Sequence, residues 1–201
     1  MFIIQEMSLE LIIGPMFAGK SSALQSIVRR RTAIGWKVLV IKHSIDRRYL
    51  EPSSTENNVV ISHDNHVCPA RASSTLMPLL EDDEFTNARL IIVEEGQFFT
   101  DIVEFVLAAV EKFGKDVVVV GLDGDAHRKP FGRILELIPL ADSVQRLFAL
   151  CRLCGDGTAA RFTCAVDSQT ALATIDGKPN VGGDDSYMPL CRKHFLSCTP
   201  A

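Results

Sequence analysis

The chain has 201 residues, six of them cysteine, and carries a formal net charge of −4 at pH 7. This length suits one medium domain with a small appendage. A protein that binds nucleic acid non-specifically usually carries a surplus of basic residues, and this chain has a surplus of acidic ones. No apolar run reaches the roughly 18 to 20 residues of a membrane helix. Glu6 and Glu10 interrupt the apolar N-terminus, which predicts a strand rather than a secretion signal. We therefore expect a cytoplasmic protein with neither a nucleic-acid nor a membrane partner.

A phosphate-binding loop is predicted from Gly14 to Ser21, because Gly-Pro-Met-Phe-Ala-Gly-Lys-Ser fits the pattern G-x-x-x-x-G-K-[ST] at every fixed position. The apolar run Leu9–Ile13 before it is typical of a buried parallel strand. In the order strand, loop, helix, the loop amides and the helix N-terminus converge on one anionic phosphate. Lys20 would reach the outer phosphates of a nucleoside triphosphate, and the Ser21 hydroxyl would coordinate Mg²⁺. The alternative is an ordinary turn with a surface lysine. The predicted phosphate site comprises Gly14, Pro15, Met16, Phe17, Ala18, Gly19, Lys20, Ser21 and Ser22.

Strand and helix patterns alternate up to about residue 148. The helix predicted after the loop has Ala23, Leu24, Ile27 and Val28 on its apolar face and Gln25, Ser26, Arg29 and Arg30 on the other. Short β-branched runs at 37–42, 90–94 and 117–122 suit the strands of a parallel sheet. Residues 101–113 form a helix candidate that ends at Gly114. This order predicts an open α/β sheet that binds its ligand outside the carboxyl ends of the strands.

A different texture begins at Cys151, where Gly, Asp, Thr and Ala dominate and apolar runs are few. This change of composition predicts two domains, a P-loop α/β domain at 1–148 and a small, loop-rich domain at 149–201. The pairs Cys151-x-x-Cys154 and Cys191-x-x-His194 have the spacing of a tetrahedral zinc site with all four positions filled by protein, which is structural rather than catalytic. The alternatives are a redox Cys-x-x-Cys pair and four unrelated residues. Paired spacing is absent from Cys68, Cys164 and Cys198, which we expect to be free thiols.

Two acidic residues, Glu94 and Glu95, follow the apolar run at 90–93. Acidic residues at the end of such a strand in a phosphate-loop protein can meet the magnesium ion and the attacking group. Because neighbouring side chains in an extended segment point to opposite sides, we expect the two carboxylates to have different tasks. The alternative for either one is a solvated surface acid.

A family resemblance runs in order from about residue 8 to residue 196. Its motifs are the phosphate loop Gly14–Ser21, Glu95-Gly96-Gln97-Phe98-Phe99, Arg128-Lys129-Pro130-Phe131, the two metal pairs and Val181-Gly182-Gly183. Together they resemble the cytosolic-type (type II) thymidine kinases. The resemblance implies a RecA-like α/β domain with a zinc-bearing lasso domain that closes over the nucleoside, usually in a homotetramer. It also implies transfer of the ATP γ-phosphoryl group to the 5′-hydroxyl of thymidine or deoxyuridine with Mg²⁺, and inhibition by thymidine triphosphate.

The resemblance further implies a role for individual residues. Glu95 would be the general base for the 5′-hydroxyl, and Lys20 and Arg48 would offset charge on the transferred group. The implied magnesium set is Ser21, Glu94 and Asp46. The implied nucleoside site is Met16, Glu95, Phe98, Leu122, Phe131, Phe162, Thr163, Val181, Gly182 and Tyr187. On the residue pattern alone, Met16, Leu122 and Phe131 suit a hydrophobic core equally well.

Three positions depart from the family pattern. Glu94 replaces the usual aspartate, Ala126 replaces a frequent aromatic residue, and His194 replaces a frequent fourth cysteine, although imidazole binds zinc equally well. Ala126 leaves open the alternative of a silent paralogue that binds nucleotide without turnover. The presence of Lys20, Arg48 and Glu95 argues against that alternative. A RecA-like ATPase whose zinc module contacts nucleic acid is a second alternative, but the acidic charge of that module opposes it.

Overall fold

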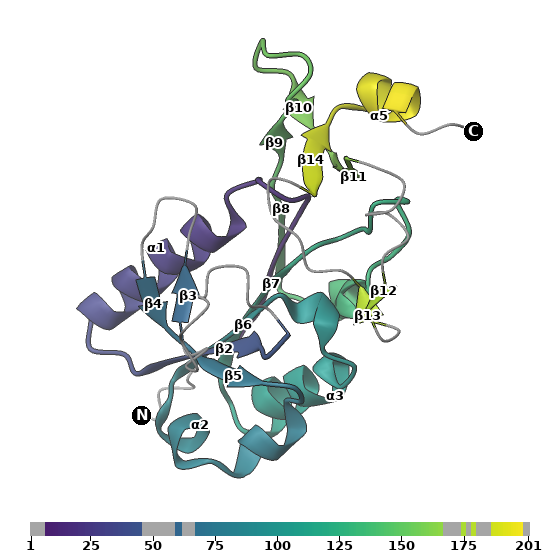
Figure 1. The fold of residues 1–201 in the computed structure, drawn as a ribbon. Coiled ribbons are helices and arrows are strands. Elements are labelled where there is room, and N and C mark those ends of the chain that lie inside the picture. The colour runs from purple at the N-terminus through teal and green to yellow at the C-terminus, as the bar shows by residue number, and fades with distance from the viewer. Residues whose placement is uncertain are drawn as a thin grey trace, which may run out of the picture.

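Six strands form one parallel sheet in the order β5-β2-β6-β7-β1-β8 in the computed structural model (Figure 1). Its strands are β1 (Leu9–Ile13), β2 (Val38–His43), β5 (Arg71–Ser73), β6 (Leu90–Glu94), β7 (Asp116–Gly121) and β8 (Ser143–Arg146). The structure describes residues 7–45, 59–61, 67–166, 174–175, 178–179 and 186–198. Every neighbouring pair of strands in this sheet runs parallel, which confirms the predicted α/β class. The predicted bounds hold for β1 and β6, and those of β2 and β7 are displaced by one residue.

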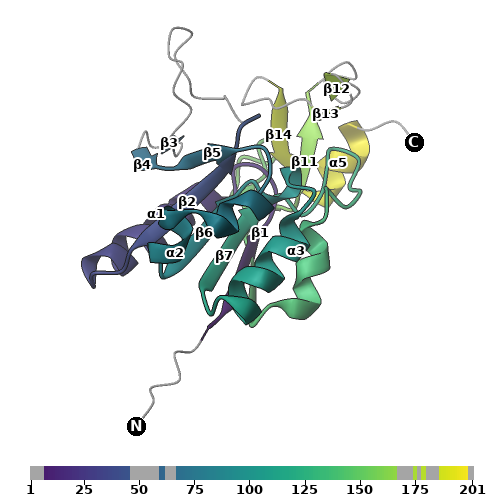
Figure 2. The same cartoon turned by 90° about the horizontal axis from the view of Figure 1, so that it is seen from below.

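Helices cover the two faces of the sheet, with α1 and α3 on opposite sides (Figure 2). The α-helices are α1 (Lys20–Ala33), α2 (Asp83–Asn87), α3 (Ile102–Leu107) and α5 (Arg192–Cys198), and the short 3₁₀ segments are η1 (Met77–Glu81), η2 (Gly96–Phe98) and η4 (Ile134–Leu140). The predicted helix at 101–113 is present but changes pitch, since a π-helical turn, η3 (Ala108–Lys112), follows α3. It ends at Gly114, whose φ of 63° is a left-handed conformation that glycine adopts without a steric penalty.

The core is divided in two by the sheet, because alternate residues of each buried strand face opposite sides. Leu11, Ile91 and Val119 pack with α3 on one side, and Ile12, Ile92 and Val120 pack with α1 on the other. The predicted apolar face of α1 is confirmed: Leu24 is buried, and Ala23, Ile27 and Val28 pack against the same cluster. One assignment on α1 was wrong. Gln25 was placed on the polar face but is only 6% exposed, because it follows Leu24 by about 100° around the helix and so borders the buried face.

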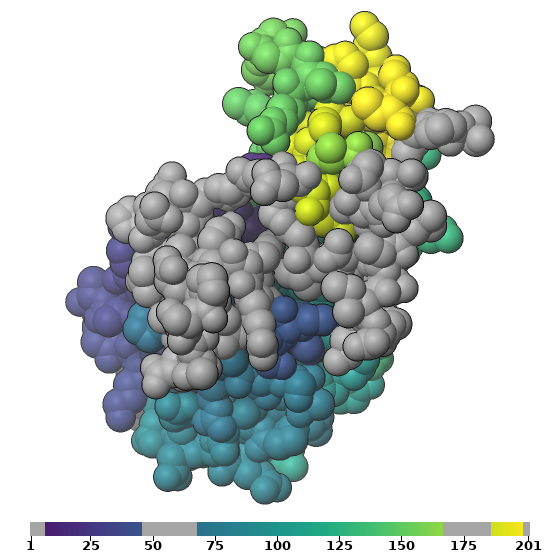
Figure 3. All heavy atoms as spheres, viewed as in Figure 1, coloured from purple at the N-terminus to yellow at the C-terminus, as the bar shows by residue number. Residues whose placement is uncertain are grey.

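The last part of the chain forms a separate lobe, which we call the cysteine module (residues 149–166 and 186–198). Figure 3 shows its green and yellow atoms projecting at the top of the molecule. Two antiparallel pairs build it: β9 (Ala149–Leu150) with β10 (Ala159–Ala160), and β11 (Phe162–Ala165) with β14 (Tyr187–Leu190). Two further antiparallel pairs are β3 (Val59–Ile61) with β4 (Val67–Pro69) and β12 (Thr174–Ile175) with β13 (Lys178–Pro179). The module has its own small core, formed by Ala149, Cys151, Ala160, Cys164, Leu190, Cys191 and Phe195.

The helices of the described part of the chain are too short or too polar to cross a membrane.

Candidate active site and metal centre

The phosphate loop connects the carboxyl end of β1 to the N-terminus of α1, in the predicted order of strand, loop and helix. Gly14 has a φ of 150°, and a Cβ there would overlap the backbone oxygen of Leu147, so the loop requires glycine at this position. Gly19 caps α1 in a left-handed conformation with a φ of 79°. The Lys20 ammonium donates a hydrogen bond to the backbone oxygen of Pro15 at 2.7 Å. The lysine head group is therefore held at the loop.

A serine and a carboxylate meet beside this loop. Ser21 lies in the first turn of α1 and donates a hydrogen bond from its Oγ to Oε1 of Glu94 at 3.0 Å. Glu94 is the last residue of β6 and is only 4% exposed. A hydroxyl and a carboxylate are hard oxygen donors of the kind that Mg²⁺ prefers, so this pair fits a magnesium site. Ser22, also predicted at the phosphate site, is exposed.

Glu95 follows with an unusual backbone. Its φ of 53° and ψ of 45° are left-handed, a conformation that is uncommon outside glycine and persists only where the surrounding structure enforces it. Its side chain is 8% exposed, and Oε2 accepts a hydrogen bond from Nε2 of Gln97 at 2.6 Å. Glu94 therefore contacts the loop serine while Glu95 contacts Gln97. The two carboxylates thus have different partners, although Glu95 lies after the end of β6 in a left-handed conformation and not in the extended segment that the sequence predicts.

An aromatic cluster lies directly after Glu95. Phe98 and Phe131 meet edge to face, with ring centroids 5.5 Å apart and an interplanar angle of 87°. Both rings are half-buried. The ring of His43, at the end of β2, lies 5.8 Å from Phe98 and 4.7 Å from Phe99. The structure therefore brings together two of the residues predicted at the nucleoside site, in an edge-to-face arrangement that is favourable for two aromatic rings.

The cysteine module contacts the phosphate loop directly. The backbone amide of Met16 donates a hydrogen bond to Oγ1 of Thr163 at 3.0 Å, and Thr163 is 5% exposed. Phe17 and Ala18 of the loop pack against the core of the module. Met16 and Thr163, both predicted at the nucleoside site, are thus brought together by backbone-to-side-chain contact.

Phe162 differs from its neighbour Thr163 in its surroundings. Within the module its ring lies 5.3 Å from Phe195 and 5.0 Å from the Arg192 guanidinium, and outside the module it lies 5.8 Å from the Arg128 guanidinium. None of these is the Phe98–Phe131 pair. Successive residues of a strand face opposite sides, so Phe162 points away from the side on which Thr163 meets the loop.

The remaining predicted site residues are partly outside the described ranges. Arg48, Asp46, Val181 and Gly182 lie outside them. Tyr187 lies opposite Ala165 in the β11–β14 pair, and its half-buried position raises the pKa of its hydroxyl. Leu122 follows β7 and donates its backbone N–H to Oε1 of Gln97 at 3.0 Å. Ala126 is partly exposed, in a turn where Asp125 accepts the backbone N–H groups of His127 and Lys129.

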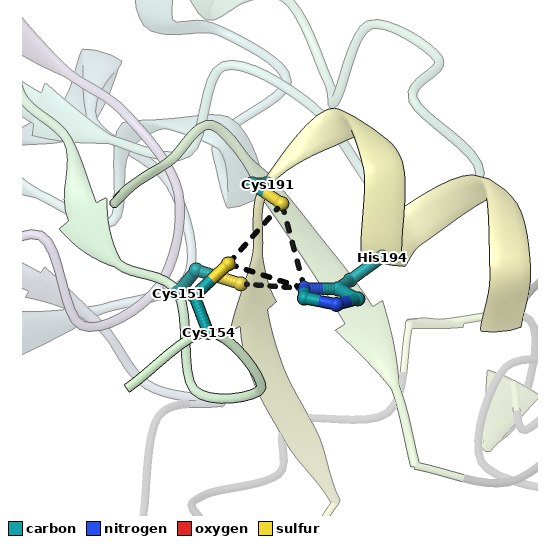
Figure 4. A group of neighbouring side chains, drawn as sticks. All are labelled: Cys151, Cys154, Cys191 and His194. Carbon is teal, nitrogen blue, oxygen red and sulfur yellow. Dashed lines mark hydrogen bonds between the residues drawn. The ribbon is translucent and has the colours of Figure 1, made fainter. Parts of the chain in front are cut away.

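Three thiols and one imidazole converge in the cysteine module (Figure 4). Nδ1 of His194 lies 3.4 Å from the sulfur of Cys151, 3.3 Å from that of Cys154 and 3.6 Å from that of Cys191. The sulfurs of Cys154 and Cys191 are 3.8 Å apart. Ligands about 2.3 Å (S) and about 2.0 Å (N) from a tetrahedral zinc ion would lie about 3.8 Å apart for two sulfurs and about 3.5 Å apart for sulfur and nitrogen. The four side chains therefore fit a tetrahedral zinc ion, and they leave no protein position open for a substrate.

Opposite pKa shifts distinguish two of these thiols. Burial disfavours the Cys151 thiolate, but hydrogen bonds from the backbone of Cys191 and from His194 outweigh it and lower the pKa of Cys151 to about 6. Burial, together with the hydrogen bond to Cys151, raises the pKa of Cys154 to about 11. Without a metal ion, the set thus holds one negative charge more readily than two. A divalent cation would favour the deprotonated form of every thiol.

The other cysteines are free thiols, as predicted: Cys68 and Cys164 are buried and Cys198 is exposed. Burial raises the pKa of the Cys68 and Cys164 thiols, which keeps both in the unreactive protonated form.

Comparison with known proteins identifies the family. The family model described as thymidine kinase matches residues 7–195. The chain belongs to the thymidine kinase family. Thymidine kinase a of Arabidopsis thaliana is 37% identical to it over 193 residues, covering 94% of this chain and 75% of the relative. The thymidine kinase of Vaccinia virus (strain Western Reserve) is 38% identical over 188 residues, covering 94% of this chain and 96% of the relative.

Two further similarities complete this comparison. The thymidine kinase of Oryza sativa subsp. japonica is 40% identical over 192 residues, covering 94% of this chain and 66% of the relative. The structure of the Legionella pneumophila ATPase DotB matches 60% of this chain with 22% sequence identity and a TM-score of 0.31, and the matched part is 31% of that chain.

Sequence analysis missed two buried polar residues of this thymidine kinase fold. Gln97 is 4% exposed and contacts both Glu95 and the Leu122 backbone. Lys42 is 6% exposed and pairs in register with Glu94 across β2 and β6, so both side chains lie on the same face of the sheet. A charged residue at the carboxyl end of an apolar strand was the available signal for Lys42. For Gln97, no pattern in the sequence indicates a contact with a residue 25 positions away.

Proposed function

We propose that this chain is an ATP-dependent thymidine kinase, which transfers the γ-phosphoryl group to the 5′-hydroxyl of thymidine and of deoxyuridine. One observation carries the proposal. Glu95, a buried carboxylate, comes one residue after the carboxylate that accepts a hydrogen bond from the phosphate-loop serine. The proposed base therefore directly follows, along the chain, the carboxylate that contacts the proposed phosphate site, and both stand at the carboxyl end of β6.

In the proposed mechanism, the 5′-hydroxyl oxygen attacks the γ-phosphorus while Glu95 accepts the hydroxyl proton, and the bond from the γ-phosphorus to the bridging oxygen breaks to release ADP. The loop amides and Lys20 hold the phosphates and offset the charge that develops on the transferred group, with Arg48 in the same role by family resemblance. Mg²⁺, held through Ser21, Glu94 and Asp46, would supply further charge neutralisation when bound. Glu94 carries one methylene more than the usual aspartate, so its carboxylate reaches further toward Ser21.

The nucleoside is proposed to lie against the Phe98–Phe131 pair, on the side of Glu95. A flat pyrimidine suits an apolar, aromatic wall, and a pocket of limited width rejects purines by size. Leu122, Met16, Thr163 and Tyr187 complete the proposed pocket together with Val181 and Gly182. The turn at Ala126 is part of the same loop as Phe131 and leaves the wall less filled than an aromatic residue would.

Replacement of Phe131 by alanine tests this wall. Since the edge-to-face pair would be lost together with contact to the base, we expect the KM for thymidine to rise about tenfold and the KM for ATP to change less than about twofold. Steady-state kinetics with each substrate varied in turn measure both. The control is Phe148→Ala, because Phe148 is an exposed aromatic residue that directly precedes the module and is outside the predicted nucleoside site. An unchanged KM for thymidine, with a lowered melting temperature, would make Phe131 a core residue.

The same proposal includes a structural zinc ion, a homotetrameric assembly and a cytoplasmic location. The zinc ion would be structural, since all four ligand positions are protein side chains. A homotetramer and inhibition by thymidine triphosphate, which would span the phosphate loop and the nucleoside pocket, are proposed from the family resemblance. The free thiols suit the reducing cytoplasm.

The test is a phosphoryl-transfer assay with ATP, Mg²⁺ and, in turn, deoxyuridine and each of the four deoxynucleosides of DNA. We expect turnover of thymidine and deoxyuridine alone. Turnover of a purine nucleoside would contradict the proposed pocket. ATP binding without any turnover would favour a silent paralogue, and the first variants to make would then be Glu94→Asp and Ala126→Phe.

A further inference from the structure

Gln97 connects Glu95 to the backbone of Leu122, the residue that follows β7, because the nitrogen and the oxygen of its side-chain amide each form one hydrogen bond. Its Nε2 donates to Oε2 of Glu95 at 2.6 Å, and its Oε1 accepts the backbone N–H of Leu122 at 3.0 Å. Gln97 is 4% exposed and Glu95 is 8% exposed, so water does not compete strongly for these hydrogen bonds. The contact between Glu95 and Gln97 is therefore stronger than a similar contact on the surface.

The orientation of this amide follows from its partners. The Leu122 N–H is a donor and can be met only by the amide oxygen, whereas the Glu95 carboxylate is an acceptor and can be met only by the amide nitrogen. A flipped amide would place two donors together at one end and two acceptors at the other. The Leu122 backbone thus directs the Gln97 N–H toward Glu95.

Glycines leave the space that Gln97 occupies. A Cβ at Gly121 would overlap Oε1 of Gln97, and a Cβ at Gly132 would overlap its backbone oxygen. Gly132 also has a φ of 58°. The close approach of β7 and of the loop after Phe131 to Gln97 therefore depends on two residues without side chains.

We propose that Gln97 is the positioning residue of Glu95: it holds the carboxylate in the orientation that receives the 5′-hydroxyl proton and favours its ionised form. This inference rests on the proposed function, in which Glu95 is the base. The left-handed backbone fixes where the Glu95 side chain starts, and the hydrogen bond from Gln97 restricts where its carboxylate ends. A hydrogen bond to the charged form of a carboxylate stabilises that form against protonation.

Two variants of Gln97 give different pH dependences under this proposal. Gln97→Met removes the donor, so kcat should fall by about 10-fold to 100-fold with little change in the KM for ATP, and the acid limb of the kcat profile should move to higher pH. Gln97→Glu is nearly isosteric but places two carboxylates in contact. At low pH the two carboxylates share one proton, and the protonated carboxyl group at position 97 can again donate a hydrogen bond to Glu95.

The kinetic test compares kcat of Gln97→Glu with the wild type from pH 6 to pH 8.5. We expect the ratio of variant to wild type to be at least about tenfold higher at pH 6 than at pH 8.5, and Gln145→Glu, an exposed change on β8, to give a constant ratio. A constant fractional loss for Gln97→Glu at every pH, or full activity of both Gln97 variants, would overturn the proposal.

A second measurement needs neither turnover nor a Gln97 variant that folds. In ¹H–¹⁵N NMR spectra, the side-chain amide signal of Gln97 in the wild type should move with pH as Glu95 takes up a proton, and it should be insensitive to pH in Glu95→Gln. An amide signal that ignores pH in both proteins overturns the inference. A signal that titrates as expected in a wild type without thymidine turnover would support the Gln97–Glu95 contact while refuting the proposed function.

Discussion

Glu95→Gln is expected to lower kcat for thymidine by about 10²-fold to 10⁴-fold while ATP binding persists. Glutamine keeps the size of the side chain but cannot accept the 5′-hydroxyl proton as a base. The phosphate loop is built from other residues, so the affinity for ATP should change less than about twofold. Turnover is measured by formation of thymidine monophosphate, and ATP affinity by calorimetry.

Glu111→Gln is the matched control for this experiment, since Glu111 is an exposed carboxylate on the π-helical turn. It should leave kcat unchanged. The left-handed backbone and the contact with Gln97 also predict that Glu95→Asp loses most of the activity, because a shorter side chain on a fixed backbone cannot reach the same point. Near-normal turnover of Glu95→Gln would remove Glu95 as the base and direct attention to Glu94.

Loss of zinc is expected to have the second large effect. A structural zinc ion contributes on the order of 10 kcal/mol to the folding of the small domain that binds it. Because the Met16 amide is bonded to Thr163 and Phe17 packs on the module core, unfolding of the module should raise the KM values of both thymidine and ATP. Cys191→Ser should therefore lose bound zinc, measured by elemental analysis, and most of the activity.

Cys198→Ser is the control for this change, because Cys198 is exposed and lies outside the ligand set. It should keep one zinc ion per chain and normal kinetics. Chelation of zinc that leaves the kinetics of the wild type unchanged would show that the four side chains are not a structural metal site.

The pH dependence of zinc binding has a definite sign. Zinc binds thiolates, and protons compete for the same sulfurs, so affinity falls as the pH falls. The pKa of Cys154, raised to about 11 in the metal-free set, means that its proton must be released on binding at neutral pH, whereas Cys151, with a pKa of about 6, is largely ionised there. We expect zinc retention at pH 7 to 8 and progressive release below about pH 6, measured with a zinc-sensitive dye.

Local patterns were sufficient for much of the fold. The phosphate loop was predicted because each of its fixed positions meets a local requirement, such as the left-handed Gly19 or the Gly14 that faces Leu147. The members of the Cys/His cluster were predicted because a Cys-x-x-Cys or Cys-x-x-His spacing by itself brings two side chains to one point. Strands β1 and β6 were predicted with their bounds because strands buried on both faces are continuous apolar runs.

Other features depend on contacts between distant parts of the chain. Gln25 was assigned to the wrong face of α1, since the width of the buried face depends on what packs against it. The change of pitch at Ala108 follows no local breaker in the sequence. The edge-to-face contact of Phe98 and Phe131 joins residues that the sequence separates by the whole of α3 and β7.

For this protein, the sequence by itself determined the type of fold, the glycine-rich loop between β1 and α1, the members of the Cys/His cluster and, through its motifs, the family. Each of these depends on residues close together in the chain or on the periodicity of a single element. Only the tertiary structure decided which partner each carboxylate has, with Ser21 for Glu94 and Gln97 for Glu95. It also decided that the module meets the loop through Met16 and Thr163. These contacts arise where strands and loops distant in sequence converge, and a hydrogen bond depends on distances that no residue pattern specifies.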